Sequence, residues 1–469
     1  MSPAKPARAP TPTSSPARLV VPGSRLAVLG AGRSGLAAAR LARRLGAASV
    51  LLADAAGDTS TIGSLDSEGI TARFDLGPRG ALSSADLDAL DAVILSPGID
   101  PALPLVAAAA ACGLPILGEL EFAWQQTDRP VVAVTGTNGK TTTTELIVRL
   151  LQHAGRRCRP AGNHGLPLSE LLLDEIDGGG RDDVHVLEVS SFQLEAIHSF
   201  RPRVAVWLNF AADHLDRYPD LEAYRQAKAR VFEFMQPEDT AVINAREPVP
   251  CGRAREVRFS LEPDVAPARW TWAAPYLCCR DRPRIALDHT RLRGRHNIDN
   301  LLAAAAAAEA LLGDDAGFES AVIDYQPPPH RYEWVADIDG RSFINDSKAT
   351  NLHALEAALL AGDEPVVLIA GGKDKQLDFS ALTSLVAERC RAVVAIGEIT
   401  PRLLAAWSPS LPCQPAADVA AAARQALAAS APGDRILFAP GTSSFDMFSG
   451  YAARGEAFRN AVQQLHPIT

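Results

Sequence analysis

Residues 130–145 read PVVAVTGTNGKTTTTE. The apolar, β-branched run at 131–134 predicts a strand, and an apolar helical pattern follows a glycine-rich turn. This order brings backbone N–H groups and the positive end of a helix to phosphate oxygens. Lys140 adds a mobile positive charge, and Thr141 adds a hydroxyl that can reach Mg²⁺. The residues that we predict to hold a nucleoside triphosphate are Gly136, Thr137, Asn138, Gly139, Lys140, Thr141 and Thr142.

This loop departs from the general phosphate-binding pattern G-x-x-x-x-G-K-[ST], which needs glycine at position 134. The chain has Val134 there, so the narrower pattern T-G-T-N-G-K-T stands in its place. A glycine-rich turn that binds nothing is the alternative interpretation. We favour the phosphate site because phosphate chemistry accounts for both Lys140 and Thr141 at these positions.

Length and composition limit the classes of protein to consider. A chain of 469 residues is too long for one hydrophobic core, so we expect roughly two to four domains. The net charge of −9 argues against a nucleic-acid partner, and no segment is apolar enough to span a bilayer. Seven cysteines without a C-x-x-C pair favour reduced thiols and a cytoplasmic protein. Residues 1–20 lack the apolar centre of a signal peptide and predict a disordered tail.

The first domain carries a second glycine-rich turn. A predicted strand at 25–29 leads into Gly30-Ala31-Gly32-Arg33-Ser34-Gly35, and a second strand ends at Asp54. This is the dinucleotide-binding fingerprint, which taken alone suggests NAD. The same turn serves any nucleotide diphosphate, and a purely structural turn is a third possibility. A further strand at 92–95 ends in a turn at Gly98, where such sheets bind ligands.

Polar residues follow the next predicted strands. Glu188 closes an apolar strand, and His214 stands in the segment after another. The carboxyl ends of parallel strands share one sheet edge, so both side chains are natural neighbours of Mg²⁺ and phosphate. A capping role is the alternative for His214. Lys228 lies in a predicted helix over 221–234 and, from its own neighbours, is typical of a solvated lysine.

The predicted alanine-rich helix at 301–312 is preceded by Asn297 and Asn300. These two side chains share one helix face and either cap the helix or contact an adenine ring. Three prolines at 327–329 then mark the clearest domain boundary.

A second set of strand–helix repeats follows these prolines, after a hairpin at Asp339-Gly340. Its strand ends and the loops after them offer side chains that could hold a small dicarboxylate, although several are equally suited to cap helices. These residues are Lys348, Thr350, Lys375 and Ser444.

We therefore predict an α/β protein of three domains. A Rossmann-like N-terminal domain covers residues 21–118, a central P-loop-type ATP-binding domain with a mainly parallel sheet covers 119–327, and a Rossmann-like domain covers 328–469.

With these motifs placed, the chain resembles the Mur ligases from about residue 22 to its end. The motifs are TGTNGKT, EVSSFQLE, N-x-x-x-DHLDR, GRHN, HR-x-E, DSKATN and PG-x-SS-x-D. TGTNGKT is shared with folylpolyglutamate synthases, whereas EVSSFQLE and DSKATN are narrower and point to the branch that adds glutamate.

The resemblance implies an ATP-dependent amide ligase in peptidoglycan precursor synthesis. It would join D-glutamate to UDP-N-acetylmuramoyl-L-alanine through an acyl phosphate and release ADP and phosphate. ATP and two Mg²⁺ ions are the implied cofactors, and we expect a monomer with small-molecule substrates only. The first domain would then bind the UDP-sugar instead of NAD.

The resemblance also implies roles for individual residues. The catalytic set is Lys140, Glu188, His214 and Lys228, with Thr141 and Glu188 at one Mg²⁺, and His214 and a carbamylated Lys228 at the other. Asn297, Asn300, Arg331 and Asp346 join the glycine-rich loop at ATP. The UDP-substrate site would take Arg33, Ser34, Asp54, Gly98 and Asn163. The glutamate site would take His330, Lys348, Thr350, Lys375, Ser444, Phe445 and Tyr451.

Two departures from the family pattern affect these expectations. Thr141 replaces a common serine and keeps its hydroxyl. Phe445 and Tyr451 stand where relatives carry other apolar or aromatic residues, so the shape of the glutamate pocket stays open.

Other functions stay open at this point. A ligase could add L-glutamate, or could use another acceptor such as a folate, although the UDP-type first domain argues against folate. An NAD-binding oxidoreductase or sensor, centred on the turn at residues 30–35, belongs to a different class. A nucleotide-binding regulator without activity is disfavoured by the complete set of Lys140, Glu188, His214 and Lys228.

Overall fold

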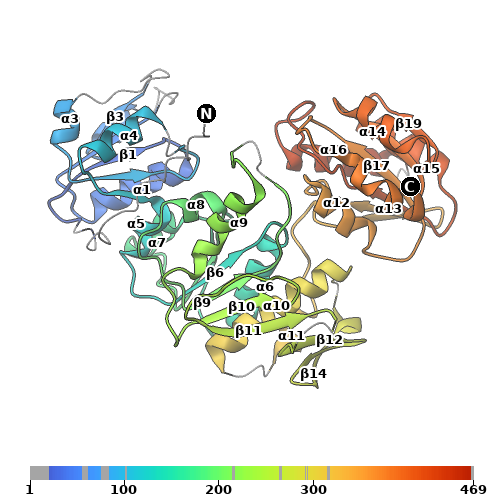
Figure 1. Ribbon diagram of the computed structural model, residues 1–469, viewed down its shortest axis with the longest axis horizontal. Coiled ribbons are helices and arrows are strands. Elements are labelled where there is room, and N and C mark those ends of the chain that lie inside the picture. Colours follow the sequence, from blue (N-terminus) through green and yellow to red (C-terminus); the bar gives the residue numbers. More distant parts are fainter. Residues whose placement is uncertain are drawn as a thin grey trace, which may run out of the picture.

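The computed structural model contains three separate α/β sheets (Figure 1). It describes residues 19, 21–54, 62–74, 84–100, 103–213, 217–262, 267–290, 292, 294–313 and 317–465. The three sheets follow one another along the chain, from blue through green and yellow to red in Figure 1. The predicted fold class, an α/β protein with Rossmann-like ends and a mainly parallel centre, is confirmed.

The first sheet has five parallel strands in the order β3-β2-β1-β4-β5. Helices cover both faces because parallel strands need crossover connections. The strands are β1 (Arg25–Leu29), β2 (Ser49–Ala53), β3 (Ile70–Arg73), β4 (Ala92–Leu95) and β5 (Ile116–Gly118). The helices are α1 (Arg33–Arg44), α2 (Ile62–Ser67), α3 (Ser84–Asp88), α4 (Pro104–Ala111) and α5 (Glu119–Trp124).

The middle sheet has nine strands in the order β14-β13-β12-β11-β10-β9-β6-β8-β7, and among these described strands only the pairs β12–β13 and β13–β14 are antiparallel. The strands are β6 (Val131–Thr135), β7 (Pro160–Gly162), β8 (His185–Glu188), β9 (Val204–Trp207), β10 (Thr240–Asn244), β11 (Arg255–Ser260), β12 (Trp270–Ala273), β13 (Tyr276–Cys279) and β14 (Arg282–Ala286). The α-helices are α6 (Lys140–His153), α7 (Leu168–Ile176), α8 (Ser191–Glu195), α9 (Leu221–Ala229), α10 (Arg295–Leu312) and α11 (Phe318–Val322).

The C-terminal sheet has six strands in the order β15-β16-β20-β17-β18-β19, with β15 antiparallel at one edge. The strands are β15 (Glu333–Ile338), β16 (Arg341–Asn345), β17 (Val366–Gly371), β18 (Cys390–Ile396), β19 (Cys413–Pro415) and β20 (Arg435–Phe438). The α-helices are α12 (Leu352–Leu359), α13 (Thr383–Arg389), α14 (Thr400–Trp407), α15 (Val419–Ala429) and α16 (Tyr451–Leu465). The hairpin predicted at Asp339-Gly340 joins β15 to β16 and is confirmed.

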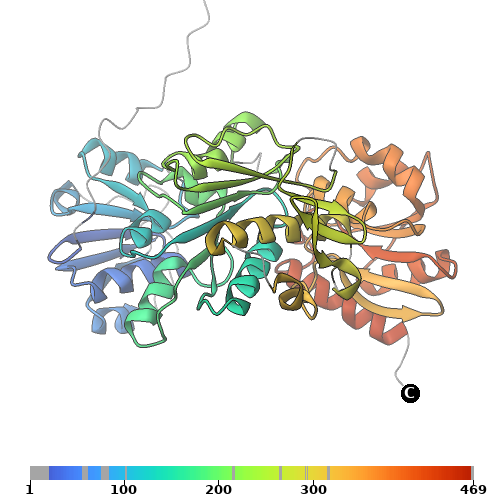
Figure 2. The same cartoon turned by 90° about the horizontal axis from the view of Figure 1, so that it is seen from below.

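One hydrophobic core passes from the first sheet into the middle sheet. It joins Leu26 of β1 to Phe122 of α5, Leu171 of α7 and Ala133 of β6, all of them almost wholly buried. The C-terminal sheet instead has its own two cores, one on each face. Figure 2 shows the middle domain between the other two. The first two domains are therefore joined by apolar packing, and the third is attached differently.

Most predicted elements lie where the patterns placed them, with small differences. The helix predicted over 221–234 ends as α9 at Ala229, and a short 3₁₀ helix, Arg230–Phe232, follows it. The predicted tail falls outside the described residues except at Leu19. Among the helices that the structure describes, none combines the length and apolar character needed to cross a membrane.

Candidate active site

The glycine-rich loop lies between β6 and α6, as predicted, and packs tightly against α10. Gly139 has a φ of +84°, and a Cβ there would lie 2.2 Å from Oδ1 of Asn300. Only glycine fits this position because the conformation and the close approach both exclude a side chain. Thr143 of α6 also donates to the same Oδ1 at 3.3 Å. The loop and the predicted adenine-side residue Asn300 are therefore in direct contact.

Lys140 folds back onto its own loop. Its Nζ donates to the carbonyl oxygens of Gly136 at 3.0 Å and Thr137 at 2.8 Å. Burial lowers the pKa of Lys140, although the negative charges of Glu188 and Asp213 act to raise it. The ammonium thus lies inside the loop, where it can reach a bound phosphate by turning from these carbonyls.

Glu188 closes β8 and is 3% exposed, yet its carboxylate is well paired. Thr141 Oγ1 donates to one oxygen at 2.6 Å, and Asn163 Nδ2 donates to the other at 2.7 Å. Burial opposes ionisation, but Lys140 and these two hydrogen bonds outweigh it and lower the pKa of Glu188. The carboxylate is therefore held ionised beside the Thr141 hydroxyl.

Lys228 is not the solvated lysine that its neighbours in the sequence indicated. It is 2% exposed, and its Nζ donates to the Gly136 carbonyl at 3.0 Å. The amine also lies 4.7 Å from the centre of the Tyr224 ring. Burial, and after it the charge of Lys140, lowers the pKa of Lys228 well below the ordinary value of a lysine. The helix α9 thus directs this lysine into the phosphate loop.

The oxygen atoms beside the loop suit a magnesium ion. Mg²⁺ takes oxygen ligands, and the Thr141 hydroxyl and Glu188 carboxylate supply two of them 2.6 Å apart. The donor set therefore fits the first predicted Mg²⁺ site. The second predicted site cannot be described in full because His214 lies outside the described residues.

A second group of possible metal ligands lies at the opposite end of β8 from Glu188. Glu175, Asp182 and His185 lie together there, and it is the one such cluster among the described residues. Arg159 donates to Asp182 Oδ2 at 3.2 Å, whereas Asp182 Oδ1 and His185 Nδ1 are buried without a hydrogen-bond partner in the part of the chain that the structure describes.

A large cleft separates the middle and C-terminal domains. Its volume is about 560 Å³, and Asn138 and Gly139 line it together with several residues predicted to bind ATP. These are Thr142, Asn297, Asn300, Arg331 and Asp346, and Lys348, which was predicted to bind glutamate, lines the same cleft. The structure therefore brings the two ends of the predicted nucleotide site to one cavity.

Arg331 links the C-terminal domain directly to the loop. Its guanidinium donates to Thr141 Oγ1 at 2.6 Å. Burial raises the pKa of Asp346 to about 7, although the hydrogen bond from the Tyr332 N–H and the positive charge of Arg331 both act to lower it. Arg331 is thus the cation that approaches Thr141 and Glu188 from across the cleft.

The other predicted glutamate residues gather at the carboxyl ends of the C-terminal strands. Lys348 lies 4.0 Å from the centre of the Tyr451 ring, and burial lowers its pKa to about 8. Lys375 forms an ion pair with Asp213 of the middle domain at 3.3 Å. Ser444 is 2% exposed, whereas Phe445 is 66% exposed. Thr350 is half-buried in the loop after β16.

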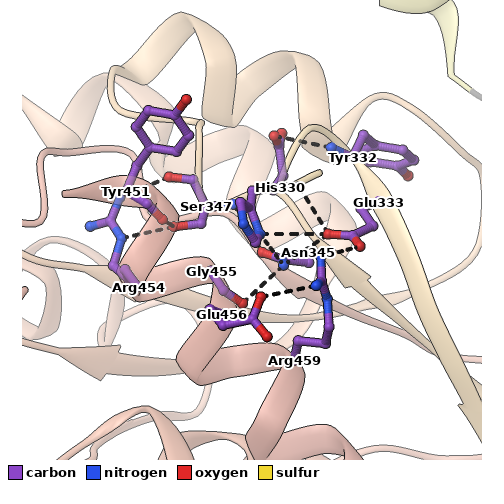
Figure 3. Close-up of polar contacts among 11 residues, drawn as sticks. His330, Tyr332, Glu333, Asn345, Ser347, Tyr451, Arg454, Gly455, Glu456 and Arg459 are labelled. Atoms are coloured by element: carbon purple, nitrogen blue, oxygen red, sulfur yellow. Dashed lines mark hydrogen bonds and ion pairs between the residues drawn. The ribbon is translucent and has the colours of Figure 1, made fainter. Parts of the chain in front are cut away.

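His330 has a different setting from these residues. It is 8% exposed and has a backbone φ of +66°. Its ring Nδ1 lies 3.0 Å from Nδ2 of Asn345. Figure 3 shows its ring directed into the domain, toward Glu333 and Gly455. An effect of His330 on glutamate binding would therefore act through the position of its turn.

The predicted UDP-substrate residues border a second cleft, of about 290 Å³, between the first and middle domains. Arg33, Ser34, Gly98 and Asn163 line it. Arg33 pairs with Glu170 at 2.8 Å and donates to the Gly165 carbonyl at 3.0 Å. Asp54 instead accepts from the N–H of Ala31 at 2.5 Å and holds the first glycine-rich turn.

Comparison with known proteins places this geometry in one family. Residues 134–308 match the Mur ligase middle domain, and residues 330–442 match the Mur ligase, glutamate ligase domain. A UDP-N-acetylmuramoylalanine–D-glutamate ligase of Desulfosudis oleivorans is 39% identical over 451 residues, covering 94% of this chain and 96% of its own. The chain belongs to the Mur ligase family. The enzyme of the same name from Anaeromyxobacter dehalogenans is 40% identical over 457 residues, 93% of this Mur ligase and 97% of its own length.

Solved structures agree with this Mur ligase in fold. A pseudomurein peptide ligase type C from Methanothermus fervidus has a TM-score of 0.60 at 18% identity, covering 94% of this chain and 100% of its own. MurF ligase from Thermotoga maritima, solved in complex with ADP, has a TM-score of 0.56 at 17% identity, covering 95% of this chain and 96% of its own. At these identities the likeness concerns the fold alone.

Several residues that contact the loop or the C-terminal strand ends in this Mur ligase were not among the predicted site residues. Asn351 and His353 bond Asn138 across the cleft, at 3.4 Å and 2.8 Å. The Asn209 side chain accepts a hydrogen bond from the Asn138 N–H at 2.9 Å and donates one to the Asn138 carbonyl oxygen at 3.1 Å. Asn209 follows β9 and begins the N-x-x-x-DHLDR motif, and Asn351 ends the DSKATN motif, so both had a sequence signal. Arg454 had none, because an arginine in a polar helical stretch is usually solvated.

Proposed function

We propose that this Mur ligase joins D-glutamate to UDP-N-acetylmuramoyl-L-alanine with ATP, giving ADP and phosphate. The observation that carries the proposal is that Lys140, Glu188 and Lys228 gather at the glycine-rich loop, whose Asn138 and Gly139 line a cleft together with Arg331 and Lys348 of the C-terminal domain. The relatives named as D-glutamate ligases match over nearly the whole chain, which supports this substrate pair.

The chemical need for ATP follows from the acceptor. A carboxylate is a poor acylating agent, so its oxygen attacks the γ-phosphorus and forms an acyl phosphate while ADP leaves. The amine of glutamate then attacks the acyl carbon, and phosphate leaves from the tetrahedral intermediate. The site must bring two anions together and exclude water from the acyl phosphate.

The residues of the chain have separate parts in this sequence. Lys140 and the N-terminus of α6 hold the β- and γ-phosphates, and Arg331 neutralises charge from the C-terminal side. Bound Mg²⁺, at Thr141 and Glu188 and at His214 with a carbamylated Lys228, would screen the phosphate and carboxylate charges. Asn297 and Asn300 lie on the adenosine side of the cleft.

The two other substrates have their own places. The UDP-sugar lies along the cleft at Arg33, Ser34, Gly98 and Asn163, with its L-alanyl carboxylate directed toward Glu188. Glutamate lies among the C-terminal residues, and the positive charges there pair with its two carboxylates. These residues are Lys348, Thr350, Lys375, Ser444, Phe445 and Tyr451, with His330 acting through its turn.

We also propose the wider setting of this enzyme. The three domains are bounded near residues 118 and 327, and every predicted site residue comes from one chain, so a monomer is sufficient. Free thiols at all seven cysteines and the use of ATP favour the cytoplasm. Peptidoglycan precursor synthesis is the process that this reaction serves.

The decisive experiment measures phosphate release from ATP and Mg²⁺ with UDP-N-acetylmuramoyl-L-alanine and D-glutamate, L-glutamate or neither. Release that depends on both the nucleotide sugar and D-glutamate supports the proposal. Release with L-glutamate alone keeps the mechanism and changes the substrate. No release, together with tight nicotinamide binding, would overturn the assignment of both glycine-rich turns.

A further inference from the structure

Arg454 lies on α16 beside Ser347 and Tyr451 and is 1% exposed (Figure 3). Its guanidinium donates to Ser347 Oγ at 3.1 Å and to the Ser347 carbonyl at 2.9 Å. It also donates to the carbonyl oxygens of Thr442 at 3.0 Å and Gly371 at 3.4 Å. One buried side chain therefore bonds three separate segments of the chain.

These three segments are the loops that carry the glutamate residues. Ser347 follows β16 and directly precedes Lys348, Thr442 follows β20 two residues before Ser444, and Gly371 ends β17 four residues before Lys375. Ser347 Oγ in turn donates to the carbonyl oxygen of Tyr451, the residue whose ring faces Lys348. The distances between the predicted ligands thus depend on what holds these loops together.

The partners of Arg454 are all neutral oxygens. Within the described part of the chain, no carboxylate forms an ion pair with it, although Asp446 exerts a weak stabilising influence. Burial lowers the pKa of Arg454 to about 10, so its charge persists at neutral pH. A planar guanidinium donates in several fixed directions, and a lysine ammonium cannot reproduce that fork.

We propose that Arg454 is a positioning residue of the glutamate site, which fixes the Lys348, Lys375 and Ser444 loops at the spacing that a dicarboxylate requires. This rests on the proposed function. Because the nucleotide loop belongs to the middle domain, loss of Arg454 acts on glutamate and leaves ATP binding at the loop nearly unchanged. The persistent charge under the loops also favours an anionic ligand over a neutral one.

The test compares initial rates of Arg454→Gln and Arg454→Lys with the wild type, varying one substrate at a time. We expect the KM for glutamate to rise at least about tenfold in both variants, because both lose the multiple donor geometry. The KM values for ATP and the UDP-sugar should stay within about twofold. Arg454→Lys retains the charge, so it also serves if Arg454→Gln fails to fold.

Arg435→Gln is the matched control for general destabilisation. Arg435 is 5% exposed and donates to the Leu359 and Gly362 carbonyls and to the Tyr332 hydroxyl, but it lies at the amino end of β20, opposite the end that leads to Thr442 and Ser444. The Arg435→Gln substitution should lower the melting temperature and leave the KM for glutamate unchanged. An unchanged glutamate KM in a folded Arg454 variant, or an equal rise in Arg435→Gln, would overturn the proposal. A wild type without glutamate-dependent phosphate release would instead refute the proposed function.

Discussion

Lys140 and Lys228 donate to the same atom, the carbonyl oxygen of Gly136, each from 3.0 Å. Two ammonium groups on one buried oxygen repel each other, so at least one amine is favoured in its neutral form. Burial and the neighbouring Lys140 lower the pKa of Lys228 well below that of an ordinary lysine. A neutral amine can add CO₂ to form a carbamate, which agrees with the modification that the family resemblance implies.

Replacing Lys228 should remove most of the activity. We expect Lys228→Ala to lower kcat at least about 100-fold because the site loses the amine that faces the loop and with it a proposed metal ligand. Added bicarbonate should not restore the rate, since no amine remains to be carbamylated. Phosphate release measures both effects. Gln226→Ala, an exposed position on the same helix, is the control and should keep full activity. Near-normal turnover in Lys228→Ala would remove Lys228 from the site.

Removing the charge of Glu188 should affect the metal requirement. Glu188→Gln keeps the size of the side chain but loses a carboxylate whose pKa is lowered by Lys140 and two hydrogen bonds. We expect kcat to fall about 100-fold and the Mg²⁺ concentration for half-maximal rate to rise. Glu145→Gln is the comparison, because Glu145 also lies on the middle domain but bonds His164 and Tyr325. An equal Mg²⁺ shift in both variants would contradict the assignment.

Glutamate affinity should decrease as the pH rises through about 8. Lys348 is charged below its pKa of about 8 and becomes neutral above it, and a neutral amine attracts a carboxylate less. Calorimetric titration of glutamate between pH 7 and 9, with the UDP-sugar and a non-hydrolysable ATP analogue present, measures this directly. Lys348→Arg stays charged throughout and should give a nearly flat profile. A wild-type affinity that is constant over this range would exclude Lys348 as a carboxylate ligand.

Arg33 and Glu170 allow a test of the UDP-substrate site. If Arg33 binds the diphosphate, Arg33→Ala should raise the KM for the UDP-sugar about tenfold through loss of a charged hydrogen bond. Glu170→Gln should leave that KM unchanged or lower it, because it releases Arg33 from its exposed ion pair. Equal increases in both variants would mean that the pair serves to join the domains.

Gly455→Ala should destabilise the protein, against the ordinary helix preference. Alanine is favoured over glycine by about 1 kcal/mol inside a helix. At Gly455, however, a Cβ would lie 2.4 Å from Nδ1 of His330, whose backbone has a positive φ. We expect a lower melting temperature and a higher KM for glutamate. Gly450→Ala, with no atom within 4 Å of its Cβ, is the control and should change neither.

The sequence was informative wherever a local pattern determines both structure and chemistry. The strand, glycine turn and helix around Lys140 carry their own signal, and Glu188 was identified because a carboxylate that closes an apolar strand needs partners. The order of β6, β8 and β9 in the sheet then brings their ends together. In such cases the position along the chain is enough to predict the site.

Residues whose role depends on distant contacts could not be found in this way. Lys228 lies on an amphipathic helix, and its burial follows from packing against Gly136, 92 residues away. Arg454 is 107 residues from Ser347, so no spacing along α16 indicates its target. The ion pair of Lys375 with Asp213 likewise depends on how two domains meet.

The core that passes from Leu26 through Leu171 to Ala133 has a mechanical consequence. Because they share one apolar core, we expect the first and middle domains to behave as a single rigid platform, with the C-terminal domain as a second body. That platform holds the cleft proposed for the nucleotide sugar at a fixed separation from the glycine-rich loop. The C-terminal body meets it at the cleft through polar pairs such as Arg331 with Thr141, which water can replace. We therefore expect that opening for substrate exchange moves the C-terminal body about the proline-rich segment at 327–329, and carries the residues proposed to bind glutamate with it.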